Sequence, residues 1–523
     1  MRHPIPLLVL SWAFCSSLGV GCSPSPIDQS PPSLRFLRDA VLVPGAEEGP
    51  QVVEREWNAG ETITMDGYTA TAPRHPECVP LFQVPLGDVS RVVSMGGTAP
   101  DTALAWSPDE RLLAVGSYRG EVVVVDGTDG TILARRRLAE TMVKQVAWAA
   151  DGQTLYATEQ SPDAFLHALD PEHLGSRWTV RLADEVGSSP APDGQDVFGV
   201  YTLPTAYQLA VLEAGDLLVG AAHGWTDKHG VRQNLSRLLR FGPDGTVRAA
   251  WPSQALDATL MHFAIDEAGD MLAVVVGRTA HGEAPPGLPI GGLQLLSLEQ
   301  LTPLRALPIA PLPPHFKSTF IWEAVGLSVA NDLVIAGMGD GRLIAQDLAG
   351  KPKWQVDLGT PLSSSTAPIS ASIGFGLLRG DQFVVHTSGT NVPYGSSSPA
   401  ARPPSPHPGD NTLSVYDVSG ALQWAHRGIE QLNGLVMGAD GRTLVVGTTA
   451  RPDDGREDLF GAALFDLDRE QAGTKERIVT CRTEGPVFFR PSLSSDGRLA
   501  LAEHPYRRAD GTLSGTYQVT VMR

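Results

Sequence analysis

One short segment gathers side chains that could bind a metal or a polar ligand. His223-Gly-Trp-Thr-Asp-Lys-His229 holds two imidazoles, one carboxylate and one indole. Imidazole nitrogens and carboxylate oxygens are common metal ligands. The spacing matches none of the standard ligand sets, such as His-Glu-x-x-His. We therefore expect an exposed loop between two strands, with no metal.

A second segment, Asp453-Asp454-Gly455-Arg456-Glu457-Asp458, offers the oxygen ligands that calcium prefers. It lacks the spacing of an EF-hand loop, so we interpret it as an acidic turn. The sequence contains no G-x-S-x-G elbow, no phosphate-binding loop and no dinucleotide-binding fingerprint. We accordingly assign no catalytic residue, no metal ligand and no cofactor.

The cysteines suggest an oxidising compartment. Of the four, Cys15 and Cys22 lie near the N-terminus, and Cys78 and Cys481 lie in the body of the chain. No C-x-x-C pair occurs, which argues against a zinc ribbon and a thioredoxin-type redox site. An exported chain can pair its two remaining cysteines. We predict a Cys78–Cys481 disulfide, with two free thiols as the alternative.

The N-terminal residues have the pattern of an export signal. Met1-Arg2-His3 is a short basic start, and the apolar run 5–14 has the length of a signal-peptide core. That run is too short to span a bilayer. We predict a signal peptide over 1–21 and a tether with an N-terminal extension over 22–77. Its first part, 23–50, is rich in Ser, Pro and Gly, as flexible linkers are.

The composition narrows the fold class. The chain has 55 Gly and 42 Pro, and 19% of its 523 residues are charged. So many turn-formers exclude a coiled coil, and the abundant aliphatic residues exclude a disordered chain. Acidic residues outnumber basic ones, 58 to 40, and no basic stripe is present. We therefore expect no nucleic-acid partner.

A repeated hairpin pattern runs through the rest of the chain. Each copy has a polar turn with Asp, Asn or Gly, an apolar strand, a second turn and a second apolar strand. Copies start within 108–130, 150–160, 214–224, 268–277, 330–350, 379–389, 439–449 and 495–504. Strands at this spacing, with no helical periodicity between them, are typical of β-propeller blades. We predict an all-β, eight-bladed propeller, with seven blades as the alternative.

The turn residues have a local explanation. Tight turns need a positive φ, which Gly adopts freely and Asn or Asp tolerate. We therefore interpret Asp109, Asp151, Asp332, Asp440 and Asp496 as turn residues rather than as a ring of metal ligands.

The two ends of the propeller are predicted to meet. VPLFQVPLGDV (79–89) is similar to PKWQVDLGTPL (352–362), which is the outer strand of its blade. Strand 79–87 is thus an outer strand with no hairpin of its own, and 515–523 is a third strand with no fourth. Pairing the two completes the last blade and hides its edges. The propeller domain accordingly spans 78–523.

Two resemblances follow from these motifs. ALDPEHLGSRW (168–178), AQDLAGKPKW (345–354) and YDVSGALQW (416–424) resemble the tryptophan-docking repeat of PQQ-like, or quinoprotein-type, propellers. The resemblance implies a structural role between blades for the Asp/Trp pairs Asp170 and Trp178, Asp347 and Trp354, and Asp417 and Trp424. Other units, such as ALAWSPDERLLAVGS, resemble WD40-like and YVTN-like repeats. A PQQ enzyme would show an adjacent Cys-Cys pair, which is absent.

Leu18-Gly19-Val20-Gly21-Cys22 resembles the lipobox of bacterial lipoproteins, with Leu18 one place early. The resemblance implies acylation of Cys22, and Ser23 after it implies the outer membrane. An ordinary secretory signal is the alternative. We expect a non-enzymatic envelope lipoprotein that binds envelope proteins, similar to outer-membrane assembly lipoproteins of the PQQ-like type. A propeller hydrolase or lactonase, and a small-ligand or carbohydrate-binding protein, are the alternatives.

Overall fold

The structure is a computed structural model of the whole chain. It describes short strands within 36–71, and then 78–87, 103–190, 202–227, 229, 231–260, 262–277, 288–289, 291–310, 321–362, 369–390, 407–427, 431–449, 460–467, 479–487, 490–507 and 512–523.

Most described strands form antiparallel units of four, in which strands adjacent in sequence pair. The first units are β6 (Leu104–Trp106), β7 (Leu112–Gly116), β8 (Glu121–Asp126), β9 (Ile132–Arg137); β10 (Met142–Trp148), β11 (Leu155–Gln160), β12 (Phe165–Leu169), β13 (Ser176–Arg181); β14 (Thr205–Val211), β15 (Leu217–Thr226), β16 (Arg232–Phe241), β17 (Val247–Leu256); and β18 (Phe263–Asp266), β19 (Met271–Val276), β20 (Gly292–Ser297), β21 (Pro303–Leu307). They are followed by β22 (Ile321–Ser328), β23 (Leu333–Met338), β24 (Arg342–Gln346), β25 (Pro352–Asp357); β26 (Ile373–Arg379), β27 (Gln382–Thr387), β28 (Thr412–Asp417), β29 (Leu422–Arg427); and β30 (Gln431–Met437), β31 (Thr443–Thr449), β32 (Gly461–Asp466), β33 (Val479–Arg482).

The last unit closes the arrangement, as the sequence predicted. It combines β34 (Ser492–Leu493), β35 (Leu499–Glu503) and β38 (Gln518–Met522) with β5 (Pro80–Pro85) from the other end of the chain. Strand β38 pairs antiparallel with β5, with Val519 opposite Val84. A single parallel bridge between Ala324 and Gly376 joins the β22–β25 and β26–β29 units into one eight-stranded sheet.

The apolar core lies in the seams between units. The run Val122–Val125 on β8 shows why, because successive side chains on a strand point to opposite faces. Val123 and Val125 pack in a cluster shared with the last unit, whereas Val122 and Val124 pack against the β10–β13 unit. A strand buried on both faces reads as a continuous apolar run.

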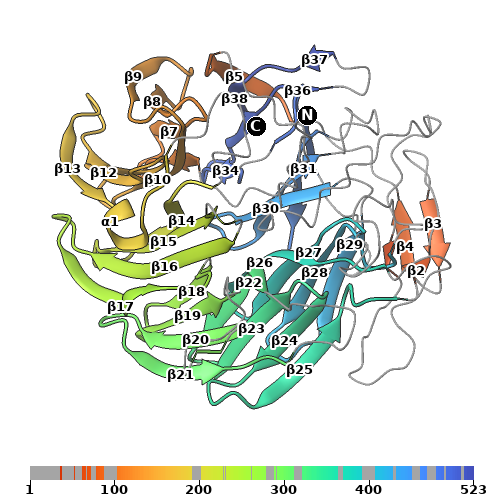
Figure 1. The fold of residues 1–523 in the computed structure, drawn as a ribbon. Helices are drawn as coiled ribbons and strands as arrows, with labels where there is room; N and C mark the ends of the chain where they lie inside the picture. The colour runs from red at the N-terminus through yellow and green to blue at the C-terminus, as the bar shows by residue number, and fades with distance from the viewer. Residues whose placement is uncertain are drawn as a thin grey trace, which may run out of the picture.

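Comparable clusters lie between all consecutive units of the described chain, and between the last unit and the first. Figure 1 shows the units following one another around a ring, with the first strands toward the middle and the fourth strands outermost. Face-to-face stacking around a ring makes this an all-β fold of the propeller type.

Smaller elements complete the description. Strands β1 (Phe36–Leu37) and β2 (Val52–Val53) pair, as do β3 (Thr62–Met65) and β4 (Tyr68–Thr71), within the stretch predicted to be a tether and extension. Strands β36 (Tyr506–Arg507) and β37 (Leu513–Ser514) form a third short pair, and α1 (Ala183–Val186) is a single turn of helix. Across the described residues, no helix has the length and hydropathy needed to cross a membrane.

Candidate functional site

The three tryptophans of the PQQ-like repeat lie on fourth strands and reach the next unit. Trp178 on β13 donates its indole N–H to the carbonyl oxygen of Pro243 at 2.8 Å, and Trp354 on β25 donates to that of Val418 at 3.1 Å. Trp424 on β29 meets the ring of Phe465 on β32 edge-on, with centroids 5.3 Å apart. A large indole fills the seam between units, and in Trp178 and Trp354 one acceptor satisfies its N–H.

The paired aspartates organise the turns between third and fourth strands. Asp170 Oδ1 accepts the backbone N–H groups of Glu172 and His173, and the hydrogen bond from His173 is the main reason that the pKa of Asp170 is lowered. Asp347 accepts the N–H of Lys351 at 2.7 Å. Asp417 accepts that of Ser419 at 2.9 Å.

The turn at Asp417 is also the docking place of Trp354. Gly420 in this turn has φ +88°, and a Cβ there would lie 2.6 Å from Trp354 Cγ. Only glycine combines this backbone conformation with so close an approach of the ring. The Asp turn of one unit thus forms the receptor for the Trp of the preceding unit.

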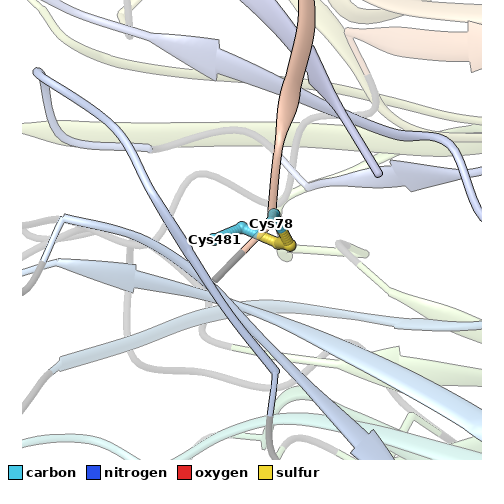
Figure 2. The surroundings of a disulfide bond; sticks show 2 residues. All are labelled: Cys78 and Cys481. Carbon is cyan, nitrogen blue, oxygen red and sulfur yellow. A yellow bond between two sulfur atoms is a disulfide. The ribbon is translucent and has the colours of Figure 1, made fainter. Parts of the chain in front are cut away.

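Cys78 and Cys481 are joined by a disulfide bond in the structure, with Cα atoms 4.8 Å apart (Figure 2). Cys78 precedes β5, and Cys481 lies on β33 of the neighbouring unit. The backbone N–H of Cys78 also donates to the carbonyl oxygen of Thr480 at 3.2 Å. The bond therefore links the closing strand to the unit before it.

The two ends of the ring differ in the length of their connections. Consecutive antiparallel strands send their connections alternately to opposite ends of a unit. Short links such as 107–111 and 212–216 join first to second strands at one end. At the other end, which we call the loop-rich end, the links include 182–204, 277–291 and 388–411. One long link, 467–478 between β32 and β33, lies at the first of these two ends, which we call the short end.

The segment around His223 lies at the loop-rich end, and the expectation of an exposed loop was wrong for part of it. His223 is in strand β15 and is only 2% exposed, because β15 and β16 form a long hairpin that α1 and the residues after it cover. Its ring stacks on Trp225 with centroids 4.1 Å apart. Its nitrogens lie 2.7 Å from Ser189 Oγ and 3.2 Å from the carbonyl oxygen of Val186.

The imidazole of His223 thus links the hairpin to the residues that cover it. Asp227, after the strand, accepts the backbone N–H of His229 and is a turn residue. Within the described part of the chain, no three His, Cys, Asp or Glu side chains are grouped so as to hold a metal ion.

A second buried polar group closes the base of the 388–411 link. Asp410 Oδ1 accepts from Arg427 Nε at 3.0 Å, and its Oδ2 accepts the Thr390 hydroxyl at 2.5 Å. The backbone N–H of His407 donates to the same Thr390 oxygen at 2.6 Å. Arg427 is 1% exposed, so this ion pair is shielded from water and fixes both ends of the link.

First strands of several units carry β-bulges near their loop-rich ends. The register shifts around Lys144 on β10, Tyr207 on β14 and Gly434 on β30, and across 374–375 on β26. A bulge adds one residue opposite a regular partner and re-aims its side chain, and bulges are common beside functional sites. The sequence did not single out these positions.

We use the name central cluster for residues of three of these bulges, Lys144, Tyr207 and Phe375, together with His262 and Arg490, which precede β18 and β34. The Lys144 ammonium lies 4.7 Å from the centroid of Tyr207, and the Arg490 guanidinium lies 5.4 Å from that of Phe375. Both distances are in the cation–π range. Lys144 is fully buried, and its Nζ also donates to Gln160 Oε1 at 3.4 Å.

Glutamines fix the cluster across units. Gln145 donates to the carbonyl oxygens of Ala206 and Tyr207 and accepts the N–H of Leu209, so its amide holds the bulge on β14. The side-chain amide of Gln208 forms a similar pair of hydrogen bonds with the backbone of Phe263, next to His262. It donates to the Phe263 carbonyl oxygen at 3.0 Å and accepts the Phe263 N–H at 2.8 Å.

The pKa of His262 responds to the charges of this cluster. This histidine is 4% exposed, and its pKa lies well below the usual range, first because of burial and then because of the charges of Arg490 and Lys144. Lys144 lies on β10, His262 immediately precedes β18 and Arg490 precedes β34, so the three groups come from separate units.

Some positions named from the sequence lie outside the described residues. They are Cys22, the signal peptide and the acidic turn 453–458.

Comparison with known proteins agrees with the repeat. Residues 88–151 match the family model of the anaphase-promoting complex subunit 4 WD40 domain. No curated protein matches the chain.

Among solved structures, the chain is similar to the C-terminal WD40 domain of Sif2, with 12% identity, a TM-score of 0.49, and coverage of 86% of this chain and 98% of that one. BamB from Moraxella catarrhalis has 15% identity, a TM-score of 0.46, and coverage of 85% and 99%. The computationally designed protein Ika8 has 14% identity, a TM-score of 0.46, and coverage of 84% and 99%. The sheet order described above makes this an all-β protein with a propeller-type fold, and residues 88–151 are similar to a WD40 domain.

Proposed function

We propose that the protein is an exported lipoprotein whose eight-bladed propeller binds a protein partner at the cell envelope. The propeller spans 78–523 and is held at the outer membrane by a lipid on Cys22 and the tether 22–77, after removal of the signal peptide 1–21. Each four-stranded unit is one blade. The Asp/Trp pairs of the PQQ-like repeat serve to dock neighbouring blades.

The observation that carries the binding role is the difference between the two ends of the ring. Long connections on a rigid scaffold are where binding residues gather. At the loop-rich end, the β15–β16 hairpin presents the partly exposed Trp225, and Val231 in the turn of this hairpin is 41% exposed. Tryptophan is one of the residues enriched at the binding hot spots of protein interfaces.

Two features support export. The lipobox-like Leu18–Cys22 follows an apolar core of signal-peptide length. In the body of the chain, Cys78 and Cys481 have Cα atoms 4.8 Å apart, a separation at which a disulfide forms readily. Disulfides persist in exported proteins and are rare in the cytosol.

A labelling experiment tests the anchor. Cells that express the full chain or its Cys22→Ala variant are fed a radiolabelled fatty acid and fractionated. We expect label in the wild-type protein, which sediments with outer membranes, and neither label nor sedimentation in the variant. Label in both proteins, or in neither, would remove Cys22 as the anchor.

Affinity capture after cross-linking tests the binding face. We expect a specific partner with the wild-type protein and a loss of at least about tenfold in its recovery with Trp225→Ser, since hot-spot tryptophans contribute about 2 kcal/mol or more. The matched control is Leu304→Ser on the outer strand β21, where Leu304 is 52% exposed. Equal recovery from both variants, or no stable partner for the wild-type protein, would count against this role.

A further inference from the structure

The outermost strands share a β-bulge at one equivalent position. In β5, β9, β13, β17, β21, β25 and β29, the pairing with the neighbouring inner strand skips one residue near the start of the strand. A bulge re-aims the side chain of the extra residue. The skipped residues are, in chain order, Leu81, Leu133, Arg177, Arg248, Leu304, Lys353 and Gln423. Charged and polar side chains suit this outer position, so the leucines need an explanation.

Two of these leucines belong to neighbouring units and have exposed apolar neighbours. Leu81 on β5 is 46% exposed, and Leu133 on β9 is 52% exposed. Val79, just before β5, is 64% exposed, and Ile132, the first residue of β9, is 42% exposed. We call these four residues the apolar rim. Single exposed apolar residues are common on soluble proteins, whereas groups of them mark interaction sites.

Direct contacts hold the two strands of the apolar rim side by side. Phe82, next to Leu81, packs on the turn that precedes β9, since a Cβ on Gly130 would lie 2.4 Å from Phe82 Cδ2. Farther along the same strands, Arg135 donates to the carbonyl oxygen of Pro85 at 3.1 Å. The exposed residues of β5 and β9 therefore flank a contact between two units.

The apolar rim lies at the short end of the ring, where the tether joins the propeller. Third and fourth strands are connected at the same end as first and second strands, and the rim lies at the start of two outermost strands. Cys78 directly precedes Val79 and is fixed by its bond to Cys481 and by its hydrogen bond to Thr480. The chain before residue 78 thus leaves the propeller at the apolar rim itself.

Charge favours one kind of surface as the partner of the rim. The protein has 58 acidic and 40 basic residues, so an anionic surface would repel it. A neutral lipid surface accepts apolar side chains among its headgroups. Insertion of a few side chains binds weakly by itself, but a lipid anchor on the same chain raises their effective concentration at the membrane.

We propose that the apolar rim lies in the headgroup layer of the membrane that holds the lipid on Cys22, an inference that rests on the proposed anchor. The short end then faces the lipid, and the loop-rich end with Trp225 points away from it, toward a protein partner. The rim thereby sets the orientation of the propeller, which a long tether alone would leave open.

Photo-crosslinking to lipid tests this docking. The mature chain 22–523, with Cys78 and Cys481 oxidised, is coupled through the Cys22 thiol to a maleimide lipid in vesicles of phosphatidylethanolamine and phosphatidylcholine. Benzoyl-phenylalanine is incorporated at position 133 or, as the matched control, at position 304. Leu304 is the bulged residue of β21, is also 52% exposed, and lies across the ring from β9 (Figure 1). We expect about tenfold more lipid adduct from position 133, since partial burial of one leucine side chain is worth a factor of this order.

Charge placed in the rim provides a second measurement. Val79→Asp/Leu81→Asp should lower the lipid adduct from position 133 by about tenfold or more, because a carboxylate resists transfer out of water. Leu304→Asp should leave that adduct unchanged. Higher salt should leave it unchanged as well, since apolar contacts are not screened. Thermal unfolding checks that each variant is folded, and position 81 replaces position 133 if the label there impairs folding.

The outcomes separate this docking from the anchor. Coupling at Cys22 is chemical, so the result does not depend on whether cells acylate this cysteine, which the radiolabelling experiment decides. Equal lipid adducts from positions 133 and 304 would overturn the docking even for an acylated protein. A cross-link between two protein chains at position 133, in place of a lipid adduct, would assign the rim to a second copy and would overturn it too.

Discussion

The indole N–H of Trp354 donates to the carbonyl oxygen of Val418 at 3.1 Å, across the seam between two units. Val418 follows Asp417, whose carboxylate accepts the N–H of Ser419 in the same turn. A turn that is stabilised within one unit thus serves as the acceptor for its neighbour. A change that weakens the Asp417 turn should therefore also weaken the docking of the neighbouring unit on it.

Trp354→Ala should lower the free energy of unfolding by about 3–5 kcal/mol, since Trp354 is 8% exposed and the change leaves a large cavity. Trp354→Phe keeps much of the buried area and should cost only about 1–2 kcal/mol, mainly for the lost hydrogen bond. Denaturant unfolding measures both. Leu304→Ala, at an exposed position, should change stability by no more than about 0.5 kcal/mol. A Phe variant as unstable as the Ala variant would contradict the packing role.

Reduction of the Cys78–Cys481 bond should destabilise the protein by up to about 5 kcal/mol in the chain-entropy model, because the two residues are 403 positions apart. Cys78→Ser/Cys481→Ser should show the same loss, and dithiothreitol should have no further effect on it. Unfolding midpoints with and without the reductant measure this. Two titratable thiols in the protein purified without reductant would argue against the bond.

Arg427→Met should destabilise the protein by about 3–5 kcal/mol, because it leaves the Asp410 carboxylate buried without its ionic partner. The matched control is Arg442→Met. Arg442 pairs with Asp466 at 2.8 Å, but their side chains are 52% and 35% exposed, and exposed pairs contribute about 0–1 kcal/mol. Denaturant unfolding distinguishes the two. Similar losses would mean that the buried pair has no special role.

Stability should fall as the pH drops below about 6.5. Burial lowers the pKa of His386 to about 4 and that of His504 to about 3. Between these values and the unfolded pKa, the unfolded chain binds more protons, so each histidine costs at most about 1.4 kcal/mol per pH unit of acidification.

His504→Asn should flatten this decline between pH 6.5 and 4, whatever it does to stability at neutral pH. Measurements of unfolding free energy at several pH values give the slope. His173→Asn, at a side chain 79% exposed, is the control and should leave the slope unchanged. A slope equal to that of the wild-type protein in His504→Asn would contradict the role of burial.

The strands and the closure of the ring were predictable because their signals are local. Asp109 and Asp440 accept the backbone N–H groups of Arg111 and Arg442 in the turns that the Asp and Gly residues marked. The similarity of 79–89 to 352–362 also predicted which residues of the two outer strands take equivalent places. Phe82 takes the place of Trp354 and packs against Gly130 of the next unit.

Other residues that dock one unit on the next were not predicted from the sequence, because side chains of different kinds can fill the seam. Arg305 occupies the same place on β21 as Trp354 on β25, directly after the bulged residue of its strand. Its guanidinium donates to the carbonyl oxygen of Ala349, as the indole does to Val418. One geometric requirement, a donor that reaches the next turn, is met by chemically unrelated residues.

The central cluster was not predictable at all. Whether Lys144 is a regular strand residue or a bulge depends on how β10 pairs with β11, and no local pattern in the sequence encodes that choice. Its neighbours His262 and Arg490 are distant in the chain. His223 was misjudged for a related reason, since its burial depends on the cover formed after α1.

The pairing of β5 with β38 also has a consequence for biogenesis. Strand β5 is synthesised long before its partner β38. Until β38 is made, β5 and β35 both present open strand edges, which invite non-native association. The ring can therefore close only after the intervening units have been made, so the most non-local pairing of the fold is also among the last that can form.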